Sequence, residues 1–205
     1  MNKSAFSVLS MLIIAAWMAA IPAVYAQTSS GDFTNEPDKT MASAHESFLK
    51  GEMDKAAEQI NKAAAYVKKE ADKVAKDSKE GVKKAGDDLE KLGQGVKKGT
   101  VKSSDELKKT FAKVDYELAK AWHKTADEAK KSGKDPSNAI KKAGVWIEGA
   151  AKWSVTQLKE GTQASVEAVK KVGKDAAKGA KVGADEVDKW FKGIGEGIED
   201  VGRKL

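Results

Sequence analysis

Apolar and small residues recur at steps of three and four through 140–205, the last third of the chain. This spacing averages about 3.6 residues and keeps the side chains on one face of an α-helix. Several positions also recur every eleven residues, a period that a nearly straight or slightly right-handed helix follows. Asp135 and Pro136 supply an N-cap and a first helical residue. The pattern predicts one long helix over 136–205, with a break near 179–183 as an alternative.

The same spacing predicts three helices before this one. The first covers about 38–50, the second is long and covers 52–99, and the third covers 104–132. Ser103 and Glu106 have the spacing of a capping box at the start of the third helix. The expected stops are the glycines that follow the three segments: Gly51, Gly99 and Gly133.

No stretch alternates between apolar and polar residues as a half-buried strand does. The sequence therefore predicts an all-α fold, an antiparallel bundle of about four helices, two of them long, with an amphipathic C-terminal helix. The expected bundle core consists of large apolar residues on the helical stripes: Phe48, Ile60, Leu107, Phe111, Val114, Leu118, Trp122 and Ile147.

The end of the chain places its apolar residues on one side of the last predicted helix. A helix of this kind can lie in a membrane interface, where tryptophan is favoured, or it can dock on the bundle. Both interpretations stay open at this point. The candidate lipid face consists of Trp190, Phe191, Ile194, Ile198, Val201 and Leu205.

The first residues have the pattern of a secretory signal peptide. A short charged start precedes an apolar run over 6–20, and Val24-Tyr25-Ala26 places small residues three before and one before the expected cleavage point. We expect a signal peptide at 1–26, a flexible leader at 27–37 and the bundle at 38–205. The expected location is the periplasm or the medium.

The charge of the chain is basic and almost entirely carried by lysine. Lysine and arginine number 37 against 31 acidic residues, for a net charge of +6, and Arg203 is the single arginine. Bidentate recognition of phosphates and guanines prefers arginine. Diffuse lysine charge suits an anionic lipid surface better than nucleic acid, so no nucleic-acid partner is expected. An ordinary solubilising surface is the alternative.

Motifs for catalysis and cofactor binding are missing from the sequence. It contains no cysteine, no phosphate loop, no nucleophile elbow and no HExxH. His45 and His123 could share a metal if their helices meet, with Glu46 or Asp127 as a further ligand, but surface histidines are the simpler interpretation. We expect no enzyme, no cofactor and no metal.

Two segments resemble the helical hairpins of tetratricopeptide proteins. In 48–63, Gly51 ends one helix and alanines line the next, as in that family, although Met53 replaces the usual aromatic residue. A similar segment spans 126–143, with one extra residue after its glycine. The resemblance implies two helical hairpins that can hold another protein's helix.

Other segments resemble the repeats of synucleins and the eleven-residue repeats of exchangeable apolipoproteins and late-embryogenesis proteins. They are Lys-Glu-Gly-Val at 79–82, Lys-Glu-Gly-Thr at 159–162 and Val-Lys-Lys-Val-Gly at 169–173. Those families bind lipid or order on drying. As a whole, the chain resembles uncharacterised exported all-helical proteins of Gram-negative bacteria, which supply no activity.

Two functions follow as expectations. The first is a non-enzymatic periplasmic protein that binds envelope lipid or an apolar ligand through lysine-bordered amphipathic helices. The second is a protein-interaction or chaperone-like module that uses its two hairpins, with a role in envelope stress.

Overall fold

A computed structural model describes residues 36–176 and 183–205. The expected signal peptide and most of the expected leader, up to residue 35, lie outside the described residues. The described part is all-helical, without strands, and contains seven packed α-helices and one 3₁₀ helix. They are α1 Glu36–Leu49, α2 Met53–Glu70, η1 Lys76–Ser78, α3 Lys79–Lys97, α4 Ser104–Lys131, α5 Ser137–Trp153, α6 Glu160–Ala176 and α7 Ala184–Gly202.

The predicted glycine stops are confirmed at the ends of α1, α3 and α4. Gly51, Gly99 and Gly133 have φ angles of 76°, 66° and 69°, a left-handed conformation that glycine adopts without a Cβ clash. After each glycine, the next N–H bonds a carbonyl five residues back. The N···O distances are 2.9 Å for Glu52 to Ser47, 2.9 Å for Thr100 to Gly95 and 2.8 Å for Lys134 to Ala129.

The predicted N-cap at Ser103 is present, whereas the helix start predicted at Asp135 lies one residue later, with Pro136 as the N-cap residue and Ser137 as the first residue of α5. The Ser103 hydroxyl accepts a hydrogen bond from the Glu106 N–H at 3.4 Å. The Asp135 carboxylate accepts one from the Ser137 N–H at 2.9 Å, with Pro136 between them. Both side chains satisfy N–H groups that have no partner within the helix.

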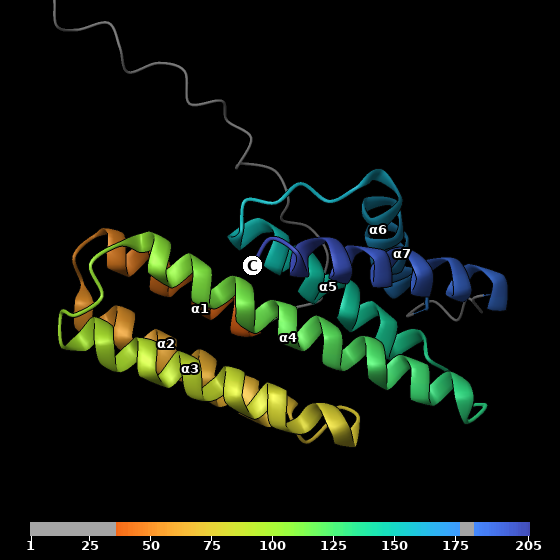
Figure 1. Cartoon of the computed structure of the whole chain (residues 1–205), viewed down its shortest axis with the longest axis horizontal. Helices are drawn as coiled ribbons and strands as arrows, with labels where there is room; N and C mark the ends of the chain where they lie inside the picture. Colours follow the sequence, from red (N-terminus) through yellow and green to blue (C-terminus); the bar gives the residue numbers. More distant parts are fainter. Residues whose placement is uncertain (1–35, 177–182) are drawn as a thin grey trace, which may run out of the picture. The chain divides into compact units, whose positions relative to one another are not determined.

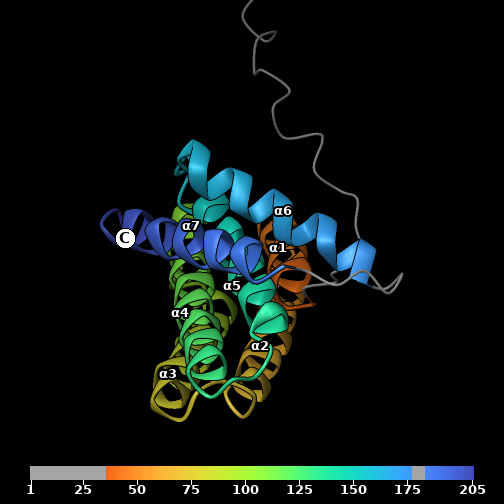
Figure 2. The same cartoon turned by 90° about the vertical axis from the view of Figure 1, so that its right-hand side faces the viewer.

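Helices α1 to α5 pack side by side and reverse direction at each connection (Figure 1). The α1–α2 turn and the α3–α4 connection lie at one end, and the α2–α3 and α4–α5 connections lie at the other. Helices α6 and α7 form a further hairpin that packs on α5 and, through α7, on α4. Figure 2 shows this hairpin running across α4 and α5. The structure therefore has more and shorter helices than the sequence predicts.

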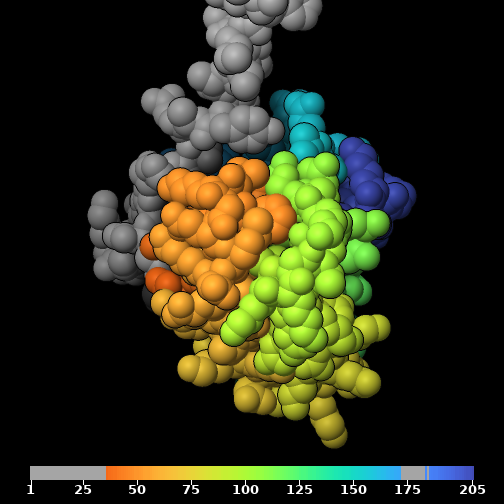
Figure 3. All heavy atoms as spheres, turned by 90° about the vertical axis from the view of Figure 1, so that its left-hand side faces the viewer, coloured from red at the N-terminus to blue at the C-terminus, as the bar shows by residue number. Residues whose placement is uncertain are grey.

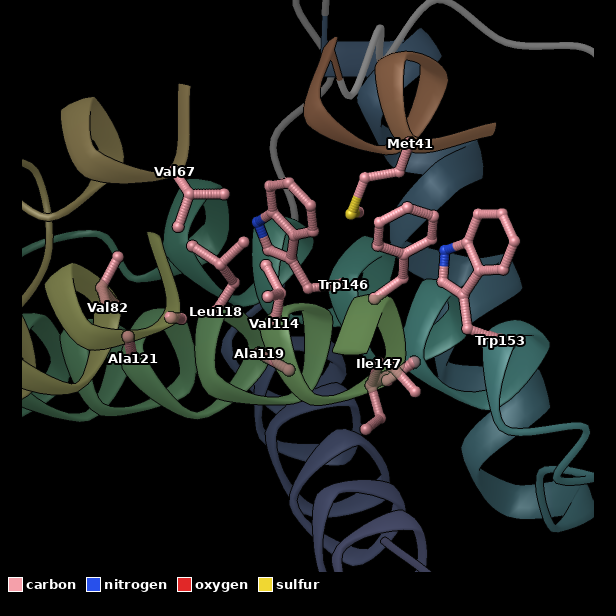
Figure 4. Close-up of a cluster of buried hydrophobic side chains, with 14 of the residues drawn as sticks. Met41, Val67, Val82, Val114, Leu118, Ala119, Ala121, Trp146, Ile147 and Trp153 are labelled. Carbon is pink, nitrogen blue, oxygen red and sulfur yellow. The ribbon is translucent and has the colours of Figure 1, made fainter. Parts of the chain in front are cut away.

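One apolar core runs through the described helices. All eight predicted core residues are buried; Phe48, at 8%, is the most exposed of them. In Figure 4, Trp146 of α5 points into the same cluster as Val67 of α2 and Leu118 of α4. These three side chains come from α5, α2 and α4, and the sequence does not show which of these helices are neighbours. The core therefore joins segments that are distant in the chain.

The predicted helix over 52–99 is interrupted at 71–78. Helix α2 ends at Glu70, and a turn and η1 precede α3. The turn keeps Val74 and Ala75 buried, which explains why the apolar spacing continues through the break. The Ala75 N–H donates to the Thr125 hydroxyl of α4 at 2.8 Å. A tertiary hydrogen bond thus replaces a helical one, and the single-helix prediction is corrected here.

The prediction of a single helix over 136–205 is also wrong, because this segment forms three helices, α5, α6 and α7. Helix α5 ends at Trp153, and Val155 takes the left-handed conformation with φ 54°. No glycine or proline marks this end in the sequence. Because the apolar spacing continues past it, the sequence predicts an uninterrupted helix here. Of the alternative break near 179–183, residues 179–182 lie outside the described residues. Gly183 is the N-cap residue of α7.

Candidate binding surface at one end of the bundle

The candidate lipid face is covered by other parts of the protein. On α7, the exposed fractions of Trp190, Ile194, Ile198 and Val201 are 8% or less. The two remaining members of the candidate face, Phe191 and Leu205, are partly buried and pack against the same core. The apolar side of the C-terminal helix is therefore part of the fold, which is the docked arrangement that the sequence left open.

Side chains of α4 hold α7 in place. The His123 ring lies 4.1 Å from the Phe191 ring, centroid to centroid, and its Nε2 lies 3.1 Å from the Phe191 carbonyl oxygen. Burial lowers the pKa of His123, while the hydrogen bond to the Phe191 carbonyl opposes that effect. The Lys130 ammonium pairs with Asp188 at 2.6 Å. These contacts fix the helix by shape and by polar bonds together.

The charge of α7 also does not match an anionic surface. Within its bounds the helix carries six acidic residues and two lysines. Like charges repel across a membrane–water boundary, so this helix on its own is poorly suited to anionic lipid. The acids are Asp185, Glu186, Asp188, Glu196, Glu199 and Asp200.

The two histidines do not meet. His45 of α1 lies against Trp153, with ring centroids 5.8 Å apart, and Phe111 of α4 lies against the same indole at 5.1 Å. His123 is twelve residues further along α4 than Phe111, about 18 Å at the rise of an α-helix. Across 36–176 and 183–205, no group of three or more metal-binding side chains is found.

A shallow hollow of about 240 Å³ lies between α1 and α2. Its lining is polar and includes Lys39, Ser43 and Lys62. An apolar ligand prefers a site lined mainly by apolar and aromatic side chains, so this hollow does not suit the apolar ligand that the sequence suggested.

Exposed lysines without an ion pair among the described residues gather around the α3–α4 connection. Five exposed lysines surround Gly99 and continue along the first turns of α4, and none makes an ion pair within the described residues. Lys108, between them, pairs with Asp105 at 3.6 Å. The five lysines, which we name the basic end, are Lys97, Lys98, Lys102, Lys109 and Lys113.

Two exposed apolar side chains flank the α1–α2 turn at the same end of the bundle. Leu49 is 64% exposed and Met53 is 37% exposed. Figure 3 looks onto this end and shows the α1–α2 turn, in orange, beside the α3–α4 connection, in yellow-green. The nearby lysines Lys50 and Lys55 are neutralised by Glu46 and Glu52. The turn that carries the exposed apolar side chains therefore lies beside the connection around which the lysines gather.

The sequence analysis missed this surface. The sequence pattern predicts a helix stop at Gly99 and a helical hairpin around Gly51, but it does not predict that the residues around these two glycines share a surface. The available signal was the charge balance of 97–113, where six lysines face two acids. The hairpins themselves, α1–α2 and α4–α5, are present as helix pairs.

No helix among the described residues is both long and apolar enough to cross a membrane. Compared with protein-family models, curated proteins and solved structures, the chain gives no match.

Proposed function

We propose that the protein is a non-enzymatic binding protein of the cell envelope that attaches to anionic lipid through the basic end. The observation that carries this proposal is the pairing of five unneutralised, exposed lysines with the exposed Leu49 and Met53. Each lysine near an anionic bilayer contributes about 1 kcal/mol. The apolar side chains add affinity by entering the interface.

The proposal differs from the expectation drawn from the sequence in the surface that meets the lipid. The C-terminal face is engaged with the core, so attachment by that face would first require α7 to detach. The basic end requires no rearrangement, because its lysines and the Leu49 side chain already lie at the surface. Lysine suits this role because its hydrated ammonium group, on a flexible side chain, attracts anionic headgroups without needing a fixed geometry.

The test is co-sedimentation with vesicles of phosphatidylethanolamine and phosphatidylglycerol. We expect binding that weakens as salt rises. A triple charge reversal, Lys97→Glu, Lys98→Glu and Lys102→Glu, should weaken binding about tenfold or more. Vesicles of neutral lipid alone should bind weakly.

The matched control reverses three exposed lysines that make no ion pair with another described residue and lie toward the opposite end: Lys76→Glu, Lys83→Glu and Lys134→Glu. It changes the net charge equally, so a nonspecific charge effect would weaken both triple variants alike. Equal weakening, or no binding by the unmodified protein, would contradict the proposal.

A second candidate is a protein-interaction or chaperone-like module. It is supported by the presence of the α1–α2 and α4–α5 helix pairs, each turning at a left-handed glycine, Gly51 or Gly133. This candidate predicts that a purified amphipathic helical peptide binds the protein without lipid, and that the charge reversals at the basic end leave peptide binding unchanged.

A further inference from the structure

The carboxyl group of Asp115 lies in the interior of the fold, independent of the proposed lipid surface. Its residue is fully buried on α4. It faces Gly149 of α5 so closely that a Cβ at position 149 would overlap the carboxyl group. The glycine therefore leaves the space that the carboxyl fills, and α4 and α5 approach each other around it.

Neither oxygen of Asp115 has a hydrogen-bond partner among the described residues. The charged groups that face it are Asp38 from α1 and Lys152 from α5. Asp38 is itself engaged, since its Oδ1 accepts a hydrogen bond from the Trp153 Nε1–H at 3.1 Å. Lys152 lies over the Trp153 ring, 5.3 Å from its centroid. Asp38 and Lys152 therefore both contact Trp153, and neither forms a hydrogen bond with Asp115.

An ionised carboxylate in such a place is strongly disfavoured, because it has lost its water and gained no donor. A neutral carboxylic acid is far easier to bury. We propose that Asp115 is a proton-binding group of the α1–α4–α5 junction, held as a neutral acid in the folded chain, so that acid tightens this junction and alkali loosens it.

The sign of the effect follows from the direction of the shift. Burial raises the pKa of Asp115 well above its ordinary value, Asp38 adds to the rise, and Lys152 opposes it. Between the ordinary and the raised pKa, the folded chain binds a proton that the unfolded chain does not. The free energy of unfolding therefore falls as pH rises through that window.

The histidines act in the opposite direction. Burial lowers the pKa of His45, helped by Lys108, and burial also lowers the pKa of His123. These groups bind fewer protons in the folded chain, so they destabilise the fold as pH falls through their range. The pH profile of the unmodified protein mixes both effects, and only a comparison between variants isolates Asp115.

The experiment compares the melting temperatures of the unmodified protein and Asp115→Asn from about pH 4 to about pH 8. The variant keeps the shape but cannot ionise. At about pH 8 we expect it to melt at least about 3 °C higher than the unmodified protein, a gap that closes or reverses near pH 4. The control is Asp72→Asn, at an exposed position without an ion pair in the described residues; its melting temperature should keep a constant offset.

A constant gap for Asp115→Asn across the same range would overturn the proposal. If the amide disturbs folding, infrared spectroscopy of the unmodified protein decides. The carbonyl stretch of a protonated carboxylic acid should persist at neutral pH in the folded protein and disappear on unfolding in urea. Its absence in the folded protein would equally overturn the proposal.

Discussion

Val155 shows what a single residue does at a helix end. Its N–H bonds the Lys152 carbonyl at 3.2 Å, and the next N–H, that of Thr156, bonds the Ala151 carbonyl at 2.8 Å. This is the same arrangement that α1, α3 and α4 make around a glycine. At the end of α5 the left-handed position is occupied by a β-branched residue instead, and its side chain is 73% exposed.

We predict that Val155→Gly stabilises the protein by about 0.5–1 kcal/mol. The left-handed conformation disfavours a side chain by about 1–2 kcal/mol, which exceeds the backbone entropy that glycine adds to the unfolded chain, about 0.5–1 kcal/mol. Little apolar burial is lost because the side chain is exposed. Urea unfolding followed by circular dichroism measures the change.

The reverse substitution provides the control. Gly133 has the same role at the end of α4, and a Cβ there would meet no atom within 4 Å. Gly133→Val should therefore destabilise the protein through backbone strain alone. A loss of stability on Val155→Gly would mean that the valine side chain makes a contact worth more than the strain.

For single residues, the sequence predicted those helix ends and starts that a glycine or a capping residue marks. It identified Gly51, Gly99 and Gly133 as stops and Ser103 as a cap, because these residue types fit one backbone conformation or one hydrogen bond. It could not identify Val155 as a stop. Valine is compatible with a continuing helix, and it rarely adopts the left-handed conformation that it has here.

At the scale of helices, glycines permit close contact. A Cβ at Gly93 of α3 would lie 3.3 Å from the Ala57 carbonyl of α2, and one at Gly86 would lie 3.4 Å from the Ala64 carbonyl. On α7, a Cβ at Gly193 would overlap Ser165 of α6. From the sequence, glycines inside helices appear only as a weakness of about 1 kcal/mol each. The structure shows that these positions bring two helix backbones together.

The break between α2 and α3 depends on a residue of a different helix. Thr125 of α4 accepts a hydrogen bond from the Ala75 N–H at 2.8 Å and donates one to the Ala121 carbonyl at 2.7 Å. Residues 71–78 contain no glycine or proline, so local chemistry does not require a turn there. The sequence analysis predicted the helices on both sides but not the break, because the group that replaces the helical bond lies fifty residues away.

We predict that Thr125→Val destabilises the protein by about 1–3 kcal/mol, because Ala75 is buried and its backbone N–H would lose its hydrogen-bond acceptor. Thermal unfolding measures the change. The matched control is Thr110→Val, because within the described part of the chain the Thr110 hydroxyl bonds only the carbonyl four residues back, that of Glu106, at 3.1 Å. That change should stay within about 0.5 kcal/mol. Similar losses at both positions would show that the bond to Ala75 contributes nothing.

For the whole molecule, the same apolar pattern supports two different surfaces. Trp190, Ile194, Ile198 and Val201 satisfy the description of a lipid face, and they satisfy equally the description of a core face. Sequence periodicity reports that a helix has an apolar side, but not what covers it. The basic end was missed for the opposite reason. The proposed lipid surface combines the basic end with Leu49 and Met53, and only the fold places the α1–α2 turn beside the α3–α4 connection.

The docked position of α7 can be tested by the energy needed to detach it. Gly144 of α5 marks the junction, where a Cβ would lie 3.0 Å from a Val169 methyl group of α6 and 3.1 Å from the Ile194 side chain. Detaching α7 would expose its five buried apolar side chains, which include Val187. At about 2 kcal/mol each, their loss is about 10 kcal/mol, comparable with the whole stability of a domain, about 5–15 kcal/mol.

We therefore predict that α7 does not open separately from the rest of the fold. In native-state hydrogen exchange, the slowest amides of α7, such as that of Ile194, should have opening free energies within about 1 kcal/mol of those of α4, such as that of Leu118. Added anionic vesicles should leave this agreement unchanged, since the basic end meets lipid without moving α7. If α7 instead exchanges several kcal/mol more easily, its apolar face becomes accessible to lipid in a minor state. In that case the C-terminal face, and not the basic end, would be the surface through which the protein meets the membrane.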